Sequence, residues 1–231
     1  MFTLLSLQAD SLTAATSTAV IENVAPNTEI SVLEFILKGG VFLIPIAILL
    51  FYTFYVIAER YMYIDRASKI DDRLLRDVGE QLQSGNIELA RAIVERSTNA
   101  SSTIIKEGIL VIGRPIAEIE SNMDRAADIE IGQMEKHLGH LGLIAGIAPT
   151  LGFIGTISGV IKIFYSISVT ENISIGNISG GLYEKMISSG AGLIVGIIAY
   201  SAYHLLNGKI DNFALKVQKQ ILEFVNIIQR A

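Results

Sequence analysis

The sequence contains no cysteine and no tryptophan. Without cysteine the chain can form no disulfide, no thiolate nucleophile and no cysteine-ligated metal site. Charged residues are also scarce, since they make up 18% of the 231 residues whereas 51% are hydrophobic. This balance, with a mean hydropathy of +0.49, indicates a membrane protein rather than an ordinary soluble domain. The net charge is −5 and no run of basic residues occurs, so we expect no binding to nucleic acid.

Three apolar segments are long enough to cross a bilayer, which requires about 20 apolar residues. None of them contains Asp, Glu, Lys or Arg. They are residues 39–58, 141–161 and 186–206. Basic residues are absent from residues 1–37 but frequent between the first two segments and after the third. Because cytoplasmic loops are enriched in Lys and Arg, this distribution predicts an N-terminus outside the cytoplasm and a C-terminus inside it.

The predicted organisation has five parts. They are a flexible extracytoplasmic tail (1–29), an outer amphipathic helix with the first transmembrane helix (30–58), a cytoplasmic helical domain (59–140), transmembrane helices two and three (141–206), and a cytoplasmic C-terminal helix (207–231). The tail is not expected to be a cleaved signal peptide, because it lacks a basic region followed by a sufficiently long apolar core. The predicted fold is therefore an all-α membrane protein with three transmembrane helices and long cytoplasmic helical extensions.

Helical periodicity continues outside the three predicted spans. Apolar residues at helical spacing predict helices within 71–83, 86–97 and 101–113. We expect the turn between the first two at Gly85, and Pro115 suits the first turn of a further helix. Because no strong helix breaker follows until Pro149, we expect one long helix to rise from the cytoplasm directly into the second span. The third span is expected to continue as an amphipathic helix.

The second and third spans carry small and hydroxyl-bearing residues that lipid contact does not require. Small residues allow helix backbones to approach closely in a membrane. This role is assigned to Gly152, Gly155, Gly159, Gly192 and Gly196. The hydroxyls of Thr156, Ser188 and Ser189 either bond to their own helices or line a polar path shared by several subunits. Ion paths in membranes usually contain an ionisable group, so a proton-conducting assembly would take its carboxylate from another chain.

Two stretches resemble a known family. APTLGFIGTISGVIKIF (148–164) and GLYEKMISSGAGLIVGIIAY (181–200) are similar to the two signatures of the ExbB, TolQ and MotA proton-channel family. The three predicted spans and the large loop after the first resemble the ExbB and TolQ branch. The resemblance implies a homo-pentamer in the lipid of the bacterial inner membrane, with a periplasmic N-terminus. This ring would enclose single-span ExbD- or TolR-like partners that supply the proton-binding Asp.

The same resemblance implies a function, that of a stator subunit in a motor driven by the proton motive force. An ExbB-type subunit would energise a TonB-like protein for transport across the outer membrane, whereas a TolQ-type subunit would serve envelope integrity and constriction. A further alternative is a passive membrane scaffold whose glycines only pack helices. The chain offers no nucleophile–base pair and no phosphate-binding or redox motif, so we expect neither an enzyme nor a cofactor.

Roles for individual residues also follow from the resemblance. Thr156 matches the family's pore threonine, Ser189 stands at the position of a second threonine, and Glu184 matches the family's glutamate. Pro149, in the Ala-Pro pair that opens the first signature, is assigned a structural role. Lys162 departs from the usual neutral residue. If Thr156 is level with Ser189 in an antiparallel hairpin, Lys162 falls near Glu184 at the channel mouth. There it either forms an ion pair with Glu184 or extends to the lipid headgroups.

One histidine pair has the spacing of metal ligands. His137 and His140 lie three residues apart, and Glu135 is nearby in the sequence. A metal site requires at least a third ligand in a preorganised position. Since the sequence indicates none, we expect no metal site and interpret both histidines as interfacial.

Overall fold

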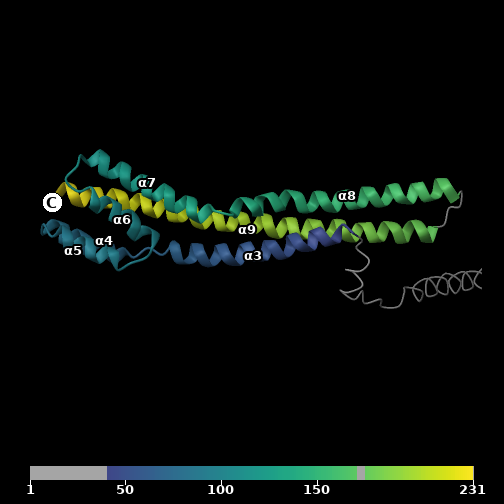
Figure 1. Ribbon diagram of the computed structural model, residues 1–231, viewed down its shortest axis with the longest axis horizontal. Coiled ribbons are helices and arrows are strands. Elements are labelled where there is room, and N and C mark those ends of the chain that lie inside the picture. Colours follow the sequence, from purple (N-terminus) through teal and green to yellow (C-terminus); the bar gives the residue numbers. More distant parts are fainter. Residues whose placement is uncertain (1–40, 171–174, 231) are drawn as a thin grey trace, which may run out of the picture. The chain divides into compact units, whose positions relative to one another are not determined.

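The computed structural model describes residues 41–170 and 175–230, so the predicted tail and outer amphipathic helix lie outside the described residues. The helices of the described part are α3 (Leu43–Ala67), α4 (Asp72–Gln83), α5 (Ile87–Glu95), α6 (Ala100–Leu110), α7 (Ile116–Glu135), α8 (Leu138–Thr170) and α9 (Ile175–Arg230) (Figure 1). These residues form no β-strand. Three stretches are long and apolar enough to cross a membrane: Leu43–Ala67, Ile116–Val169 and Ile178–Gln229. The predicted all-α membrane fold is confirmed.

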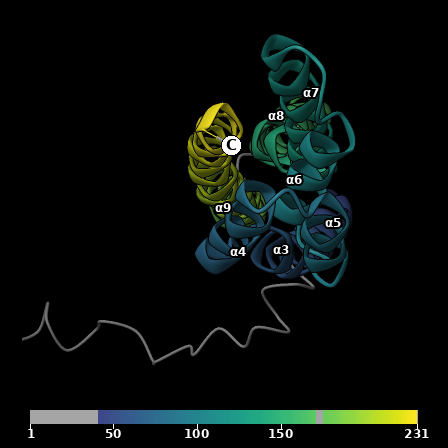
Figure 2. The same ribbon diagram turned by 90° about the vertical axis from the view of Figure 1, so that its left-hand side faces the viewer.

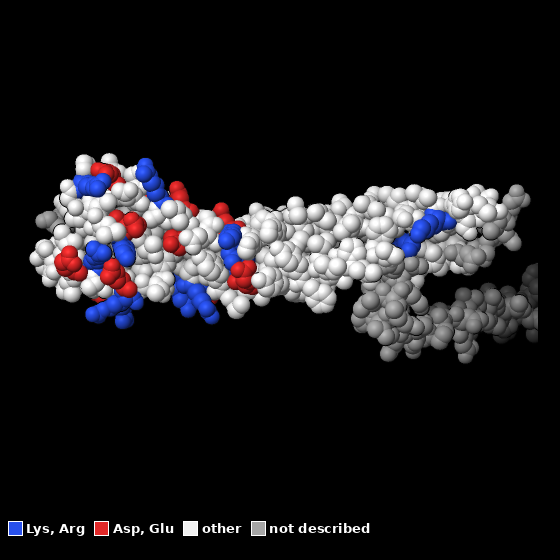
Figure 3. Space-filling model, viewed as in Figure 1, with Lys and Arg blue, Asp and Glu red and all other residues white. Residues whose placement is uncertain are grey.

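Charge is distributed unevenly along these helices. On the face shown in Figure 3, acidic and basic side chains gather over the half that contains α4 to α7, and the other half is almost uncharged. We call α4 to α7 with residues 209–230 of α9 the charged end. The apolar end comprises residues 43–58 of α3, α8, and residues 175–208 of α9. Phe153, Ile161 and Leu205 in the apolar end are more than 60% exposed, as expected for a surface in contact with lipid rather than water.

Local signals explain the helices of the charged end. Asp71 caps α4, since its carboxylate accepts a hydrogen bond from the backbone N–H of Arg73 at 3.0 Å. Gly85 has a left-handed φ of +77° in the turn before α5, a conformation that glycine adopts without steric cost. Pro115 directly precedes α7. The helices predicted between residues 71 and 113 are therefore present as α4, α5 and α6, and α9 continues unbroken over 56 residues.

The predicted continuous helix into the second span is wrong at one point. α7 ends at Glu135 and α8 begins at Leu138, with His137 in a left-handed conformation at φ +66°. Histidine adopts this conformation more readily than most residues, so the break requires neither glycine nor proline. No local sequence signal marks it, and the contacts that stabilise it come from α3.

Two hydrophobic cores lie along the bundle, and α9 contributes to both. The core of the charged end contains large side chains such as Phe213, Phe224 and Met123, which are at most 2% exposed. The core of the apolar end is smaller and consists of Ile46, Ile144, Ala148, Val195 and Ala199. Viewed along the bundle, α9 lies on one side and α7 and α8 on the other (Figure 2). α3 and α8 also contribute buried residues to both cores, so these three helices together connect the membrane-compatible half to the charged half.

Candidate functional site

The hairpin of α8 and α9 brings the two signature stretches into direct contact. At Gly192, an added Cβ would overlap the backbone oxygen of Ala148. At Gly152, it would lie 2.9 Å from the Cα of Ser189, and at Gly196, 2.6 Å from the Cγ of Pro149. No side chain fits at these positions without moving backbone or the proline ring. These glycines and Pro149 thus lie where the two helices approach most closely, as small residues do in membrane helix pairs.

The three predicted pore hydroxyls differ in their surroundings. Ser188 is 1% exposed, and its hydroxyl donates to the backbone oxygen of Lys185 at 2.9 Å. A Cβ at Gly155 would lie 3.0 Å from this hydroxyl, so Ser188 faces α8 inside the hairpin. The Thr156 hydroxyl donates to the backbone oxygen of Phe153 at 2.7 Å, while its side chain stays half-buried. Within a single chain Thr156 is therefore more accessible to another subunit than Ser188.

The register of the hairpin can be read from these contacts. Ser189 lies against Gly152, about one helical turn from the level of Thr156, and Ser188 lies against Gly155. Thr156 and Ser189 therefore belong to the same segment of the hairpin but are not directly opposite one another. A shared pore lining by their hydroxyls stays a prediction, because it depends on faces formed between chains.

The two charges predicted to lie at the channel mouth, Lys162 and Glu184, have a further lysine, Lys185, next to them in the sequence. Lys162 is exposed on α8, whereas the side chain of Glu184 lies outside the described residues. The pair between them therefore stays a prediction. The stem of Lys185 lies directly against Gly159, where an added Cβ would overlap its side-chain carbons. Gly159 thus accommodates a lysine stem in the hairpin, a role that its spacing from Gly155 alone did not indicate.

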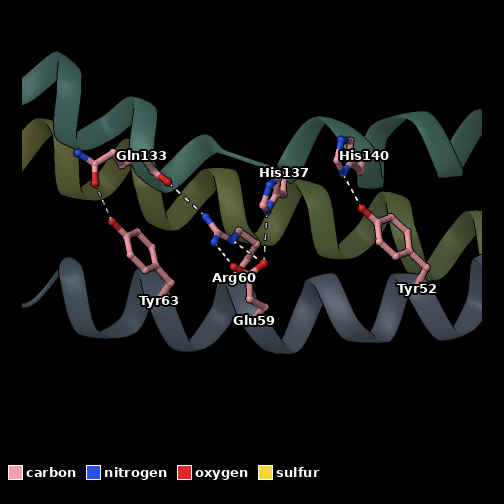
Figure 4. A network of polar contacts seen from close by, with 7 residues as sticks. All are labelled: Tyr52, Glu59, Arg60, Tyr63, Gln133, His137 and His140. Carbon is pink, nitrogen blue, oxygen red and sulfur yellow. Dashed lines mark hydrogen bonds and ion pairs between the residues drawn. The ribbon is translucent and has the colours of Figure 1, made fainter.

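A polar network links α3 to the break between α7 and α8 (Figure 4). Arg60 is 6% exposed, and its guanidinium binds the neighbouring Glu59 carboxylate through two nitrogens. Its Nη1 also donates to the backbone oxygen of Gln133 at 3.3 Å. The Tyr63 hydroxyl donates to the side-chain oxygen of Gln133 at 3.2 Å. Both the main chain and the side chain of Gln133 are thus held by α3.

The Arg60 contact explains how the helix break is stabilised. In an uninterrupted helix, the backbone oxygen of Gln133 would accept a hydrogen bond from the N–H of His137. At the break, Arg60 donates to this oxygen instead. Gln133 is an exposed residue whereas Arg60 is buried, so an arginine fixed in the packed surface of α3 supplies the donor that the interrupted helix lacks. Arg60 is a positioning residue whose partner lies 73 residues away in the sequence.

Two histidines complete the network on the side of α8. The rings of His137 and His140 stack with centroids 5.5 Å apart. The Nδ1 of His137 lies 3.5 Å from a Glu59 carboxylate oxygen, and the Nδ1 of His140 lies 2.7 Å from the Tyr52 hydroxyl. Both rings therefore face polar groups of α3. Within residues 41–170 and 175–230, no group of three His, Cys, Asp or Glu is placed to hold a metal ion.

Comparison with known proteins agrees with the two signature stretches. Residues 88–219, more than half of the chain, match the model of the MotA/TolQ/ExbB proton channel family. The chain is 30% identical to the "Putative biopolymer transport protein ExbB homolog" of Methanothermobacter thermautotrophicus, over 81% of this chain and 67% of that protein. It is 26% identical to the "Putative biopolymer transport protein ExbB-like 1" of Synechocystis, over 75% of this chain and 70% of that one.

A relative with a different name shares a shorter region. The chain is 27% identical to the "Tol-Pal system protein TolQ" of Haemophilus influenzae, over 47% of each chain. The matched family region includes the charged-end helices α5 to α7, all of α8 and most of α9. It therefore contains the glycine-packed hairpin and the α7–α8 break. The chain belongs to the MotA/TolQ/ExbB proton channel family.

Proposed function

We propose that this multi-pass membrane protein is the proton-channel stator subunit of an ExbB–ExbD type motor. The observation that carries the proposal is the composition of the three apolar segments 39–58, 141–161 and 186–206, which contain hydroxyls but no carboxylate. An ExbD- or TolR-like single-span partner would supply the proton-binding Asp, and Thr156 would face it from the half-exposed surface of α8. Two ExbB-named relatives match 81% and 75% of the chain, whereas the TolQ-named one matches 47%. We take this as support for the ExbB role in energising a TonB-like protein over the TolQ role.

The division of labour can be tested by reconstitution. The protein alone in liposomes is expected to conduct few protons, because none of its spans supplies an acidic relay. Adding the single-span partner should produce flux driven by a proton gradient. Sustained flux by the isolated protein, equal to that of the two-component complex, would contradict the proposal. If the assembled complex conducts no protons, the passive scaffold becomes the better explanation.

Thr156 offers a sharper test, because the same helix contains a matched control. Thr150 also donates its hydroxyl to a backbone oxygen three residues earlier, that of Ile147, at 2.8 Å. We expect Thr156→Val to abolish proton flux while the ring still assembles, whereas Thr156→Ser and Thr150→Val retain it. Full activity of Thr156→Val would assign Thr156 to helix packing alone. Native mass spectrometry of the same samples should give five copies of this chain.

The channel-mouth pair is tested by charge reversal. Under the proposal, Lys162→Glu and Glu184→Lys each impair flux, and the double exchange restores part of it because the opposite charges face one another again. A double-mutant cycle measures this coupling. If the two single effects simply add, Lys162 extends to the headgroups and Glu184 acts without it.

We also propose the inner-membrane orientation with a periplasmic N-terminus and a cytoplasmic C-terminus. The distribution of Lys and Arg supports it. The absence of cysteine makes the test direct, because Asn226→Cys introduces a single thiol on the exposed part of α9. A membrane-impermeant maleimide should label this thiol only after the membrane is opened. Labelling of this thiol in intact cells would contradict the proposed orientation and indicate a C-terminus outside the cytoplasm.

A further inference from the structure

A groove lies between α3 and α9 where the apolar end meets the charged end. Its volume is about 520 Å³. Ile57 of α3 and Ala202 and Leu205 of α9 form an apolar part of its lining. Leu205 is 73% exposed, so this wall is open to the surroundings rather than covered by another helix of the same chain. The remainder of the lining includes Tyr61, Gly208, Lys209 and Asn212.

The groove spans the level at which the helices change from uncharged to charged. On α3, Glu59 and Arg60 are the first charged residues after the first span, and Tyr61 follows them directly. On α9, residues 186–208 contain no Asp, Glu, Lys or Arg, and Lys209 is the first charged residue after them. In a bilayer that covers the uncharged residues, one part of the groove would lie at the depth of lipid chains and the other at the depth of headgroups.

Lys209 supplies a cation at the charged side of the groove. Its Nζ lies 3.9 Å from the centroid of the Tyr61 ring, a cation–π contact that holds the ammonium group without cancelling its charge. Among the described residues, Lys209 forms no ion pair with an acidic side chain. The Asn212 amide beside it donates to the backbone oxygen of Gly208 at 2.7 Å. The positive charge of Lys209 thus lies next to the apolar part of the groove.

We propose that this groove binds one phospholipid with an anionic headgroup. The acyl chain would lie against Ile57, Leu205 and the open surface at Gly208, and the phosphate would contact the Lys209 ammonium. The groove has an apolar wall at one end and a single cation at the other. A phospholipid has the matching arrangement, with an apolar acyl chain joined to a negatively charged headgroup. Lipid binding at this site does not require proton conduction, so the lipid proposal can be tested independently of the stator proposal.

Two substitutions address the two parts of the lipid. At Gly208, no atom lies within 4 Å of an added Cβ, so Gly208→Leu fills the groove without displacing the helix. Lys209→Gln removes the charge but keeps most of the side-chain length. A basic residue at a membrane surface contributes roughly 1 kcal/mol toward anionic lipid, about a fivefold preference. The controls are Gly132→Leu, also at an open helical position, and Lys216→Gln, an exposed lysine about two turns further along α9.

The experiment uses the full chain in phosphatidylcholine nanodiscs with spin-labelled phosphatidylglycerol or spin-labelled phosphatidylcholine. Electron paramagnetic resonance then measures the fraction of immobilised lipid. We expect Lys209→Gln to lose the roughly fivefold preference for phosphatidylglycerol, Gly208→Leu to lose one immobilised lipid of either kind, and both controls to retain it. Unchanged preference in Lys209→Gln, or equal loss in Lys216→Gln, would overturn the proposal. A changed subunit number in Gly208→Leu with unchanged lipid binding would assign the groove to a second copy of the chain.

Discussion

The apolar end and the charged end of this protein are held together by different kinds of contact. In the charged end, Phe213, Phe224 and Met123 interdigitate as large buried side chains. In the apolar end, the contact between α8 and α9 is made by backbone meeting backbone, as at Gly192 and Ala148. The atoms that surround a glycine also differ between the two ends. Gly108 in the charged end faces the tips of Met123 and Phe224, whereas Gly192 faces a carbonyl oxygen.

The difference follows from the solvent around each end. Water favours burial of large apolar side chains at about 25 cal/mol per Å², so the charged end gains stability from side-chain volume. Lipid is itself apolar, and the helices gain little by hiding such side chains from it. They gain instead from close van der Waals contact, which small residues permit. The same α9 therefore uses large residues over its charged part and glycines over its apolar part.

The largest expected effect is in the charged end. Phe224→Ala removes a side chain that is 0% exposed, and such truncations cost about 3–5 kcal/mol. The loss should appear as a lower thermal unfolding temperature of the detergent-solubilised protein. Leu222→Ala is the control, since Leu222 on the same helix is 61% exposed. Equal losses for both variants would mean that α9 is not packed by side-chain burial in this end.

The next effect separates the two kinds of glycine. Gly192→Ala forces the backbone of α8 to move, so it should lower the free energy of unfolding by about 1–3 kcal/mol, the usual cost of overpacking. Gly190→Ala, where no atom lies within 4 Å, should be neutral or slightly stabilising because alanine favours helix. At Gly108, an added Cβ would lie 2.6 Å from the Sδ of Met123 and 2.7 Å from Cε1 of Phe224. Gly108→Ala should still cost less than Gly192→Ala, because side chains rather than backbone must move. A larger loss of stability for Gly108→Ala than for Gly192→Ala would contradict the distinction between side-chain packing in the charged end and backbone packing in the apolar end.

A smaller effect is expected at the junction of the two ends. Arg60→Leu leaves the Gln133 oxygen and the Glu59 carboxylate without their donor. We expect a loss of about 1–2 kcal/mol, low in the range for an unsatisfied group, because Gln133 is exposed and the Glu59 side chain is 33% exposed. Hydrogen exchange should increase at residues 134–140, the region of the break. Arg66→Leu, an exposed arginine later on α3, should leave exchange there unchanged.

The smallest effect concerns surface charge in the charged end. Glu95 lies 3.2 Å from Arg91 and 3.4 Å from Lys106, and these cations hold the pKa of its carboxyl below the ordinary value. A lowered folded-state pKa stabilises above the unfolded pKa and loses this contribution as the pH falls through the folded pKa. Glu95→Gln should therefore lower the unfolding temperature slightly at neutral pH, with the difference vanishing in acid. A difference that grows in acid would contradict this sign.

Much of the fold could be predicted from local sequence. The spans follow from uncharged runs of sufficient length, and α4 to α6 follow from helical periodicity with turn residues such as Gly85. The glycines of the second and third spans predicted the close approach of α8 and α9. What could not be predicted was which hydroxyl is enclosed. Ser188 and Ser189 are chemically identical neighbours, and the rotation of α9 against α8 places Ser188 inside the hairpin.

The sequence by itself determined which segments are compatible with lipid and which with water, because hydropathy and charge are summed over neighbouring residues. The tertiary structure alone decided where the helix entering the second span breaks and how the break is satisfied. That decision depends on Arg60 reaching the Gln133 oxygen across 73 residues of sequence. It also depends on the meeting of Ile57 and Tyr61 with Leu205 and Lys209 that forms the groove. A hydrogen bond or a groove between distant helices exists only once packing has set their depth and rotation, and no local run of residues specifies either.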